Sequence, residues 1–202
     1  MGTIARFDLP DLMQRYGLTC FVETGTGTGD GLAHAAKFPF VKLRSCEYEI
    51  GLVKQLYKRF PIDDRIHFLC SDSVWFLERS GACNAKEPIL FWLDAHFPGA
   101  DYGLKPYGHE TNTDTRLPLE RELKAIGLRR PKGQDVIICD DLRIYMDGPF
   151  QHGNLPADLR SLCPAERNID FVHQIMGTTH DIELLFEHEG YIVMTPKGKV
   201  HG

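Results

Sequence analysis

The stretch Phe21-Val22-Glu23-Thr24-Gly25-Thr26-Gly27-Thr28-Gly29-Asp30-Gly31 organises the rest of the chain. An apolar run ends in an acidic residue, four glycines follow at every second position, and residues 32–38 are then expected to form a helix. Glycine lets the backbone adopt positive φ and lets a ligand approach without a Cβ in the way. A strand, a glycine-rich turn and a helix N-terminus in this order predict a nucleotide-sized binding site.

The spacing of the glycines excludes two common nucleotide-binding motifs. The dinucleotide fingerprint requires glycine at its sixth position, which is Asp30 when counted from Gly25, and no Gly-Lys-Ser/Thr of a P-loop follows. The pattern Glu-x-Gly-x-Gly-x-Gly instead resembles motif I of the class I methyltransferases that depend on S-adenosylmethionine (SAM). The alternative is a flexible glycine turn in an unrelated α/β protein.

The composition is that of an ordinary soluble protein. The chain has 202 residues, of which 43% are hydrophobic and 25% charged, and this suits one domain over residues 1–202. The net charge of −5 argues against a nucleic-acid partner, because nucleic-acid-binding domains usually carry a basic face. No apolar run approaches the length of a membrane span, and the first residues lack the apolar core of a signal peptide.

The six cysteines form no CxxC pair and no zinc-binding spacing. Cys20, Cys46, Cys70 and Cys139 lie in or at the ends of apolar runs, so we expect them to be small buried hydrophobic residues. Together with the missing secretion signal, this use of cysteine predicts a protein of the reducing cytoplasm.

Five alternations of strand and helix precede a hairpin. The expected parallel strands are residues 20–24, 40–46, 65–70, 88–94 and 135–141, and the hairpin is formed by 182–187 and 191–195. This order predicts a Rossmann-like α/β fold of the SAM-methyltransferase type, with a mostly parallel seven-stranded sheet, a C-terminal antiparallel hairpin and helices on both faces. Trp75 and Trp92 are expected in the core, and His173 and His180 at the surface or at helix ends.

Acidic residues end all five expected parallel strands. These residues are Glu23, Glu47, Asp72, Asp94 and the pair Asp140-Asp141. Because parallel strands present their carboxyl ends at one edge of a sheet, and ligands bind there, we expect these side chains to converge.

The resemblance to class I methyltransferases implies cofactor-binding roles at the ends of the first four of these strands. Glu23, Thr24 and the loop glycines Gly25, Gly27 and Gly29 would lie by the methionine part of SAM. Glu47 would accept hydrogen bonds from the ribose hydroxyls, and Asp72 with Ser73 would lie by the adenine amine. Asp94 would border the cofactor as well.

Each of these assignments has a plainer alternative. Glu47 could be an exposed acid at a helix start, favoured by the helix dipole. Asp72 could be an ordinary N-cap. Glu49 competes with Glu47 for the ribose role, because strand ends are uncertain by a few residues.

Asp94, Asp140 and Asp141 follow two neighbouring strands and would place three carboxylates around one hard cation. Oxygen ligands favour Mg²⁺, with Mn²⁺ as a substitute. The arrangement resembles the metal-dependent O-methyltransferases, which include macrolide-sugar and catechol-type enzymes. The macrocin O-methyltransferase-like sugar branch is the more similar, because Asp-Asp is retained and His96 follows Asp94.

The resemblance implies methyl transfer to a hydroxyl of a small polar acceptor, such as a sugar, a glycan end or a natural product. Asp94 and His96 would be catalytic, with His96 as general base, because an imidazole can take up a proton near neutral pH. Lys105, Tyr107 and His109 are rival bases in residues 95–116, an aperiodic segment expected to be an active-site lid. Alternatively, His96 is a structural histidine and Asp140-Asp141 cap the next segment.

Other functions stay open at this point. A metal-dependent hydrolase or phosphotransferase would also use an acidic cluster at strand ends, and an enzyme with this fold could perform a different tailoring reaction. A non-catalytic SAM-fold module would have no need for the acidic set. The sequence leaves the oligomeric state open, with a homodimer as the alternative to a monomer.

Overall fold

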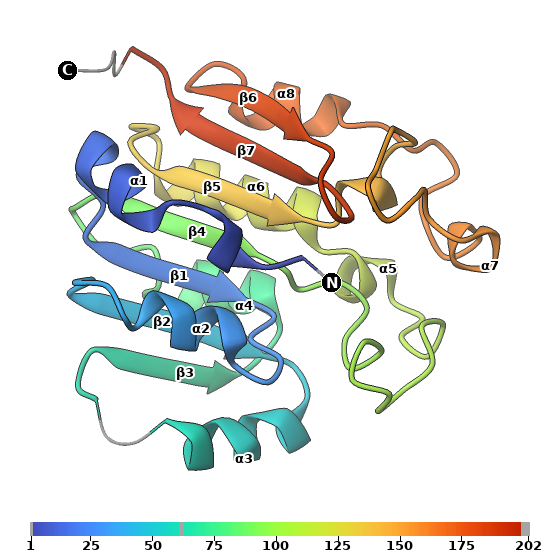
Figure 1. Ribbon diagram of the computed structural model, residues 1–202, viewed down its shortest axis with the longest axis horizontal. Helices are drawn as coiled ribbons and strands as arrows, with labels where there is room; N and C mark the ends of the chain where they lie inside the picture. The colour runs from blue at the N-terminus through green and yellow to red at the C-terminus, as the bar shows by residue number, and fades with distance from the viewer. Residues whose placement is uncertain (1, 61–62, 199–202) are drawn as a thin grey trace.

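The computed structural model describes residues 2–60 and 63–198 and shows one seven-stranded sheet in the order β3-β2-β1-β4-β5-β7-β6 (Figure 1). Strands β1 to β5 are parallel, and β7 runs antiparallel to both β5 and β6. The fold predicted from the sequence is confirmed. The strands are β1 (Cys20–Thr24), β2 (Lys42–Glu47), β3 (Ile66–Cys70), β4 (Ile89–Leu93), β5 (Val136–Asp140), β6 (His180–Leu185) and β7 (Tyr191–Pro196).

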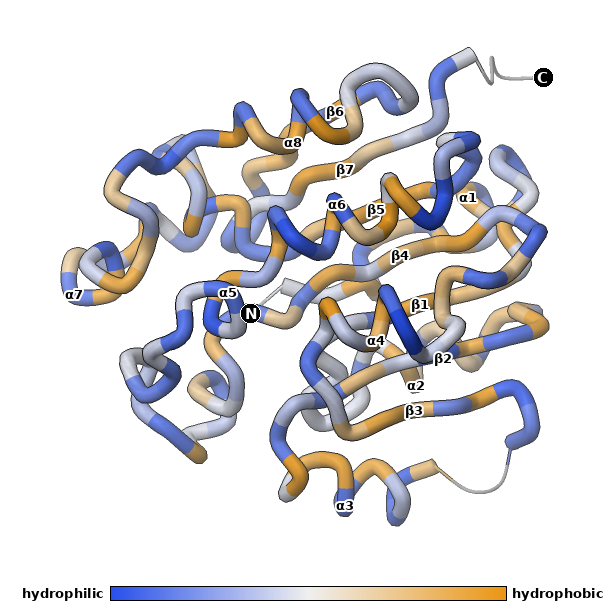
Figure 2. The backbone as a smooth tube through the Cα atoms, turned by 180° about the vertical axis from the view of Figure 1, so that it is seen from behind, coloured by the Kyte–Doolittle hydropathy of each residue, from blue (hydrophilic) through white to orange (hydrophobic). Residues whose placement is uncertain are grey.

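Helices cover both faces of this sheet, as expected for β–α alternation. In Figure 1, α1 (Leu9–Tyr16), α2 (Asp30–Ala35) and α3 (Ile50–Arg59) lie on the near face. The opposite face, seen in Figure 2, carries α4 (Ser73–Arg79), α6 (Leu119–Arg129) and α8 (Asp170–Met176). Four short helices complete the described elements: η1 (Ile4–Arg6), η2 (Leu142–Ile144), α5 (Thr113–Arg116) and α7 (Ala157–Arg160).

The central strands β1, β4 and β5 are buried at every residue. Their side chains alternate between two apolar clusters, so that Phe21 and Leu90 pack on one face while Val22 and Phe91 pack on the other. Figure 2 shows the same strands as a mostly hydrophobic band beneath the helices. Burial on both faces explains why these strands have continuous apolar runs rather than alternating ones.

Several details differ from the sequence-based expectations at the edges of the sheet. Strand β2 begins at Lys42, two residues later than expected, because Phe38 to Phe40 form a turn in which the Phe40 N–H bonds the Phe38 carbonyl at 2.9 Å. Cys70 is exposed at the end of the edge strand β3, and Trp75 on α4 is 49% exposed, whereas Trp92 is buried.

His180 was expected at the surface or a helix end, but it is 2% exposed. Its Nε2 lies 3.1 Å from the Asp135 carbonyl and its Nδ1 lies 2.8 Å from the Thr179 hydroxyl. These two partners satisfy both ring nitrogens, so the imidazole is a structural one. His173 is exposed, as expected.

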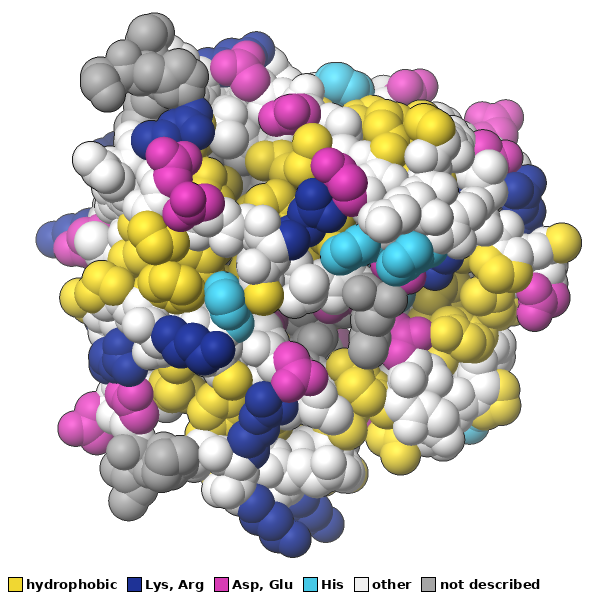
Figure 3. Space-filling view, in the orientation of Figure 1, with side chains coloured by type: hydrophobic (Ala, Val, Ile, Leu, Met, Phe, Trp, Pro, Cys, Tyr) yellow, Lys and Arg dark blue, Asp and Glu magenta, His cyan; other side chains and the backbone are white. Residues whose placement is uncertain are grey.

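Two irregular segments lie beyond the carboxyl ends of the parallel strands (Figure 1). Residues 95–116 consist mainly of turns and end in α5, and residues 145–168 include α7. On the face shown in Figure 3, lysine and arginine side chains are scattered among acidic ones. Within the described ranges, none of the helices has the length and apolar character of a membrane span.

Candidate functional site

The glycine turn between β1 and α2 uses left-handed backbone at three positions. Gly25, Gly27 and Gly29 have φ values of 72°, 55° and 89°, a region that favours glycine. A Cβ on Gly25 would collide with the carbonyl oxygen of Asp94, and one on Gly27 would collide with the hydroxyl of Tyr102. The turn is therefore in close contact with the backbone that follows β4 and with the 95–116 segment.

Glu47 lies at the end of β2 and is held by the glycine turn. Its Oε2 accepts a hydrogen bond from the Gly27 N–H at 2.8 Å, and its Oε1 accepts one from the Glu49 N–H at 2.7 Å. Burial raises the pKa of Glu47, and the two backbone donors act in the opposite direction. The side chain is 5% exposed and borders a cleft, so it is not an exposed helix-start acid.

Glu23 supports the glycine turn from behind. The Ser45 hydroxyl donates to its Oε2 at 2.7 Å, and a Cβ on Gly31 in α2 would collide with its Oε1. Burial raises the pKa of Glu23 to about 8. The side chain is 2% exposed and does not belong to the described residues that line the cleft. Thr24, Gly27 and Gly29 do not belong to the described lining of the cleft either.

The cleft opens at the carboxyl ends of β1 to β4 and spans about 720 Å³ of empty space, part of which is open to solvent. Among the predicted site residues it is lined by Gly25, Glu47, Asp72, Ser73, Asp94 and His96. Tyr48, Ser71, Asp101 and Tyr102 also contribute to its wall. The sequence-predicted convergence of the strand ends is therefore present at one edge of the sheet.

Asp72 is the N-cap of α4 and also lines the cleft. Its Oδ1 accepts a hydrogen bond from the Trp75 N–H at 2.8 Å and so caps α4. The neighbouring hydroxyls of Ser71 and Ser73 are buried and have no hydrogen-bond partner among the described residues. Because buried hydroxyls are normally bonded, these two groups at the cleft wall fit a polar ligand such as SAM.

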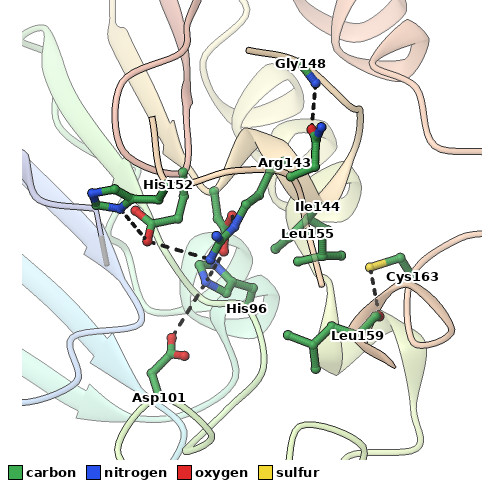
Figure 4. A network of polar contacts seen from close by, with 12 residues as sticks. His96, Asp101, Arg143, Ile144, Gly148, His152, Leu155, Leu159 and Cys163 are labelled. Carbon is green, nitrogen blue, oxygen red and sulfur yellow. Dashed lines mark hydrogen bonds and ion pairs between the residues drawn. The ribbon is translucent and has the colours of Figure 1, made fainter. Parts of the chain in front are cut away.

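His96 lies among carboxylates that come from two strand ends and from the 95–116 segment. Its Nδ1 is 3.5 Å from Asp94 Oδ1, and its Nε2 is 3.5 Å from Asp141 Oδ2 and 3.9 Å from Asp101 Oδ2. Figure 4 shows His96 between Asp101 and the Arg143 side chain. The imidazole is only 11% exposed, so its two nitrogens face acidic groups rather than bulk water.

The crowding of these carboxylates affects their protonation. Burial, followed by the charge of Asp140, raises the pKa of Asp94 well above its usual range. Burial raises the pKa of Asp140 to about 7, while the charge of His96 acts in the opposite direction. Burial also raises the pKa of Asp141, which has left-handed backbone with a φ of 58°. The cluster would therefore favour a bound positive charge.

The carboxylate oxygens match the donors that Mg²⁺ and Mn²⁺ prefer, and Oδ1 of Asp140 is buried with no hydrogen-bond partner in the described chain. Within residues 2–60 and 63–198, however, no three histidine, cysteine, aspartate or glutamate side chains are gathered as metal ligands. Asp94 and Asp141 instead face opposite nitrogens of His96. The donor chemistry fits a divalent cation, and the metal site stays a prediction.

A second hollow, with about 570 Å³ of empty space, lies on the β5 side of His96. It shares His96 and Asp101 with the cleft, and Gly2, Tyr107, Asp140, Asp141, Arg143 and Glu189 also line it. Arg143 donates to Asp141 Oδ1 from its Nε at 3.0 Å and lies 3.7 Å from Glu189. The sequence did not single out Asp101, which lies in the 95–116 segment, or Glu189, which lies in the turn between β6 and β7.

The three alternative general bases in the 95–116 segment either bind other side chains or lie outside both hollows. Lys105 forms an ion pair with Glu49, and the Tyr107 hydroxyl donates to Asp101 Oδ1 at 2.6 Å. His109 is exposed and does not belong to the described lining of either hollow. His96 is the imidazole that borders both hollows.

No protein-family model and no curated protein matches the chain. Its structure is similar to that of a putative caffeoyl-CoA O-methyltransferase from Staphylococcus aureus, with a TM-score of 0.58, 9% identity, and coverage of 93% of this chain and 80% of that one. An SAH-bound methyltransferase from Podospora anserina has a TM-score of 0.59 and 14% identity, with 96% and 83% covered.

The O-methyltransferase TomG from Streptomyces achromogenes, involved in tomaymycin synthesis and solved in complex with SAM, is a third similar structure. It has a TM-score of 0.53 and 13% identity, with 94% of this chain and 78% of that one covered. The chain therefore has the fold of the class I SAM-dependent methyltransferases, in agreement with the resemblance seen in its glycine motif.

Proposed function

We propose that the protein is a SAM-dependent O-methyltransferase that acts on a hydroxyl of a small polar acceptor. The observation that carries this proposal is the cleft in which the glycine turn, Glu47 and Asp94 come together at the carboxyl edge of a methyltransferase-type sheet. His96 lies where this cleft meets the second hollow, and a methyl group would have to pass at that point.

For the cofactor, we assign the ribose hydroxyls to the oriented carboxylate of Glu47. The adenine end would lie by Asp72, with Ser71 and Ser73 supplying the buried hydroxyls that lack partners in the described chain. The glycine turn would lie by the methionine part, with Gly25 in the wall of the cleft. Glu23 and Thr24 would act from behind the turn rather than by contact.

SAM supplies an electrophilic methyl group on a sulfonium leaving group. In the proposed reaction the acceptor O–H bond would break and its proton would pass to Nε2 of His96. The acceptor oxygen would gain the methyl group as the methyl–sulfur bond breaks, which leaves S-adenosylhomocysteine as a neutral thioether. Nε2 is the nitrogen that faces Asp101, Asp141 and the second hollow, while Asp94 faces Nδ1 and would hold the imidazole in place. The chain otherwise acts by positioning two reactants.

We further propose that Asp94, Asp140 and Asp141 hold a divalent cation, Mg²⁺ or Mn²⁺, which would lower the pKa of the acceptor hydroxyl. The buried, unpartnered Oδ1 of Asp140 and the all-oxygen donor set support this assignment. Burial, together with the neighbouring carboxylates, raises the pKa values of Asp94 and Asp140, and a bound cation would act against both causes.

The acceptor would occupy the second hollow. Asp101, Tyr107, Arg143 and Glu189 provide polar groups there that suit a hydroxylated molecule, and a sugar or glycan end fits this chemistry. The acidic side chains of the lining disfavour phosphorylated or carboxylated acceptors. The six cysteines, which form no disulfide within the described residues, are in keeping with a cytoplasmic enzyme.

The proposal is tested by calorimetric titration with S-adenosylhomocysteine (SAH), the demethylated product, in Mg²⁺ and again in EDTA. Micromolar binding in both conditions is the expected result, and acceptors would then be screened with Mg²⁺ present. If SAH binds in neither condition, the cofactor assignment is wrong. The acidic cluster would then be tested for hydrolase or phosphotransferase activity. The protein would also be tested for a tailoring reaction other than methylation.

A further inference from the structure

The segment after β4 contains a compact turn, residues 99–104, which is closed by backbone hydrogen bonds. The Leu104 N–H donates to the Gly99 carbonyl at 3.1 Å, and the Gly103 N–H donates to the Ala100 carbonyl at 2.9 Å. Gly99 and Gly103 have left-handed backbone, with φ values of 76° and 65°. Because these bonds close the turn on itself, we expect its residues to move as one unit.

Tyr102 is the residue of this turn that reaches the glycine turn. It lines the cleft together with Gly25, Glu47 and Asp94. A Cβ on Gly27 would collide with the Tyr102 hydroxyl oxygen, so the aromatic side chain lies directly against the backbone of the glycine turn. Gly27 itself does not belong to the described lining of the cleft. On this side of the cleft, Tyr102 therefore stands where a ligand would otherwise meet Gly27.

Glu49, the residue that precedes α3, holds the 99–104 turn in this position. Lys105 directly follows the turn and forms an ion pair with the Glu49 carboxylate, and a Cβ on Gly99 would lie 3.1 Å from Glu49 Cγ. The Glu49 side chain is 13% exposed and the Lys105 side chain 30%, so solvent screens this pair only in part. Glu49 also donates its N–H to Glu47. One residue thus joins the turn to the end of β2.

Asp101, next to Tyr102, connects the same turn to the acceptor side. Its Oδ2 lies 3.9 Å from Nε2 of His96 (Figure 4). Among the described lining residues, Asp101 borders both hollows, whereas Tyr102 borders the cofactor cleft and not the second hollow. A displacement of the turn would therefore change the surroundings of His96 as well as the wall of the cofactor cleft.

We propose that Tyr102 is a cofactor-binding residue and that the Glu49–Lys105 ion pair is a latch that holds it in place over the cleft. This inference rests on the proposed function, because it concerns the site for SAM. A ligand that fills the cleft beside Gly25 contacts Tyr102, and it is retained for as long as Lys105 holds the turn. The latch therefore acts mainly on the rate at which the cofactor dissociates.

The latch is tested by the rate at which radiolabelled SAH is released after a chase with unlabelled SAH. Lys105→Met and Glu49→Gln should each release SAH roughly fivefold faster, the effect of losing one partly buried ion pair. The double variant with Glu49→Lys and Lys105→Glu should return the rate close to the wild-type value, because it restores the pair with the charges exchanged.

The matched control for the latch is Lys124→Met, which breaks an exposed ion pair with Glu120 on α6. Its release rate should equal that of the wild type. Wild-type release rates in both Lys105→Met and Glu49→Gln, or no recovery in the double variant, would overturn the latch.

Tyr102→Ala tests the contact with the cofactor itself. SAH affinity should fall roughly tenfold, because a ligand in the cleft loses an aromatic contact. Tyr57→Ala, which removes an exposed tyrosine on α3, is the control. Unchanged affinity in Tyr102→Ala, or a loss that only follows a lower melting temperature, would remove Tyr102 from the cofactor site. A wild-type protein that does not bind SAH would instead overturn the proposed function itself.

Discussion

The backbone N–H of Gly27 donates a hydrogen bond to the carboxylate of Glu47 at 2.8 Å, across the gap between the first two strands of the sheet. One carboxylate oxygen is thus used to fix the glycine turn, and the other is fixed by the Glu49 N–H. Both oxygens of this carboxylate are therefore held by backbone donors at the wall of the cleft.

Replacing Glu47 by alanine should therefore weaken SAH binding more than the loss of a ligand contact alone would. We expect a decrease of roughly 100-fold, because hydrogen bonds to a charged group are lost and the glycine turn loses its anchor. Calorimetry with SAH measures the effect. Glu183→Gln, on the exposed face of β6, is the control. Equal affinities in wild type and Glu47→Ala would remove Glu47 from the cofactor site.

His96→Asn should lower methyl transfer by roughly 10² to 10⁴-fold, the range for losing a general base. SAH affinity should change little, because the imidazole faces the acceptor side through Nε2. The measurement is the rate of SAM conversion with an acceptor found by screening, paired with SAH titration. Undiminished turnover in His96→Asn would transfer the role of base to another group.

Asp140→Asn tests whether the carboxylate cluster binds a divalent cation. We expect the variant to lose stimulation by Mg²⁺ while it still binds SAH, because Asp140 borders the second hollow rather than the cofactor cleft. Asp158→Asn, an exposed acid on α7, serves as the matched control. Turnover that is indifferent to EDTA in the wild type, or normal stimulation in Asp140→Asn, would rule out a metal site at these carboxylates.

Glu23 should make the stability of the protein depend on pH. Its pKa is raised from a usual value of 4.5 to about 8 in the folded state, so between these values the folded protein holds a proton that the unfolded chain has lost. The free energy of unfolding must then fall as the pH rises from 4.5 to about 8, by up to about 1.4 kcal/mol per pH unit.

Glu23→Gln removes this contribution, so urea unfolding at pH 5, 6.5 and 8 should give a flatter dependence on pH than in the wild type. The other buried acids are present in both proteins, so only the difference between the two curves is interpreted. Parallel curves would mean that Glu23 is ionised in the folded protein throughout this range.

The sheet was predictable because its central strands are buried on both faces. Continuous apolar runs then stand out in the sequence, and an acidic residue marks each carboxyl end. The edge of the sheet was less predictable. Trp75 on α4 and Cys70 on β3 are residue types that are usually buried, yet both are exposed. Strand β3 is at the edge of the sheet and has a neighbouring strand on one side only, a position that the residue types do not reveal.

The site was predictable where its residues follow a strand directly. Glu47, Asp94 and His96 all border the cleft, as their sequence positions indicated. Glu23 also ends a strand, but its side chain points toward Ser45 and α2, a direction that sequence spacing does not reveal.

Because no side chain separates Gly25 from the carbonyl of Asp94, the turns after β1 and β4 meet backbone to backbone. A displacement of the first turn cannot be absorbed by a change of rotamer and must be passed on to Asp94, and from there to His96 two residues later. We therefore expect an ordered kinetic mechanism, in which SAM enters first and sets the acceptor side. Initial-rate patterns that fit random addition would show that the two turns move independently.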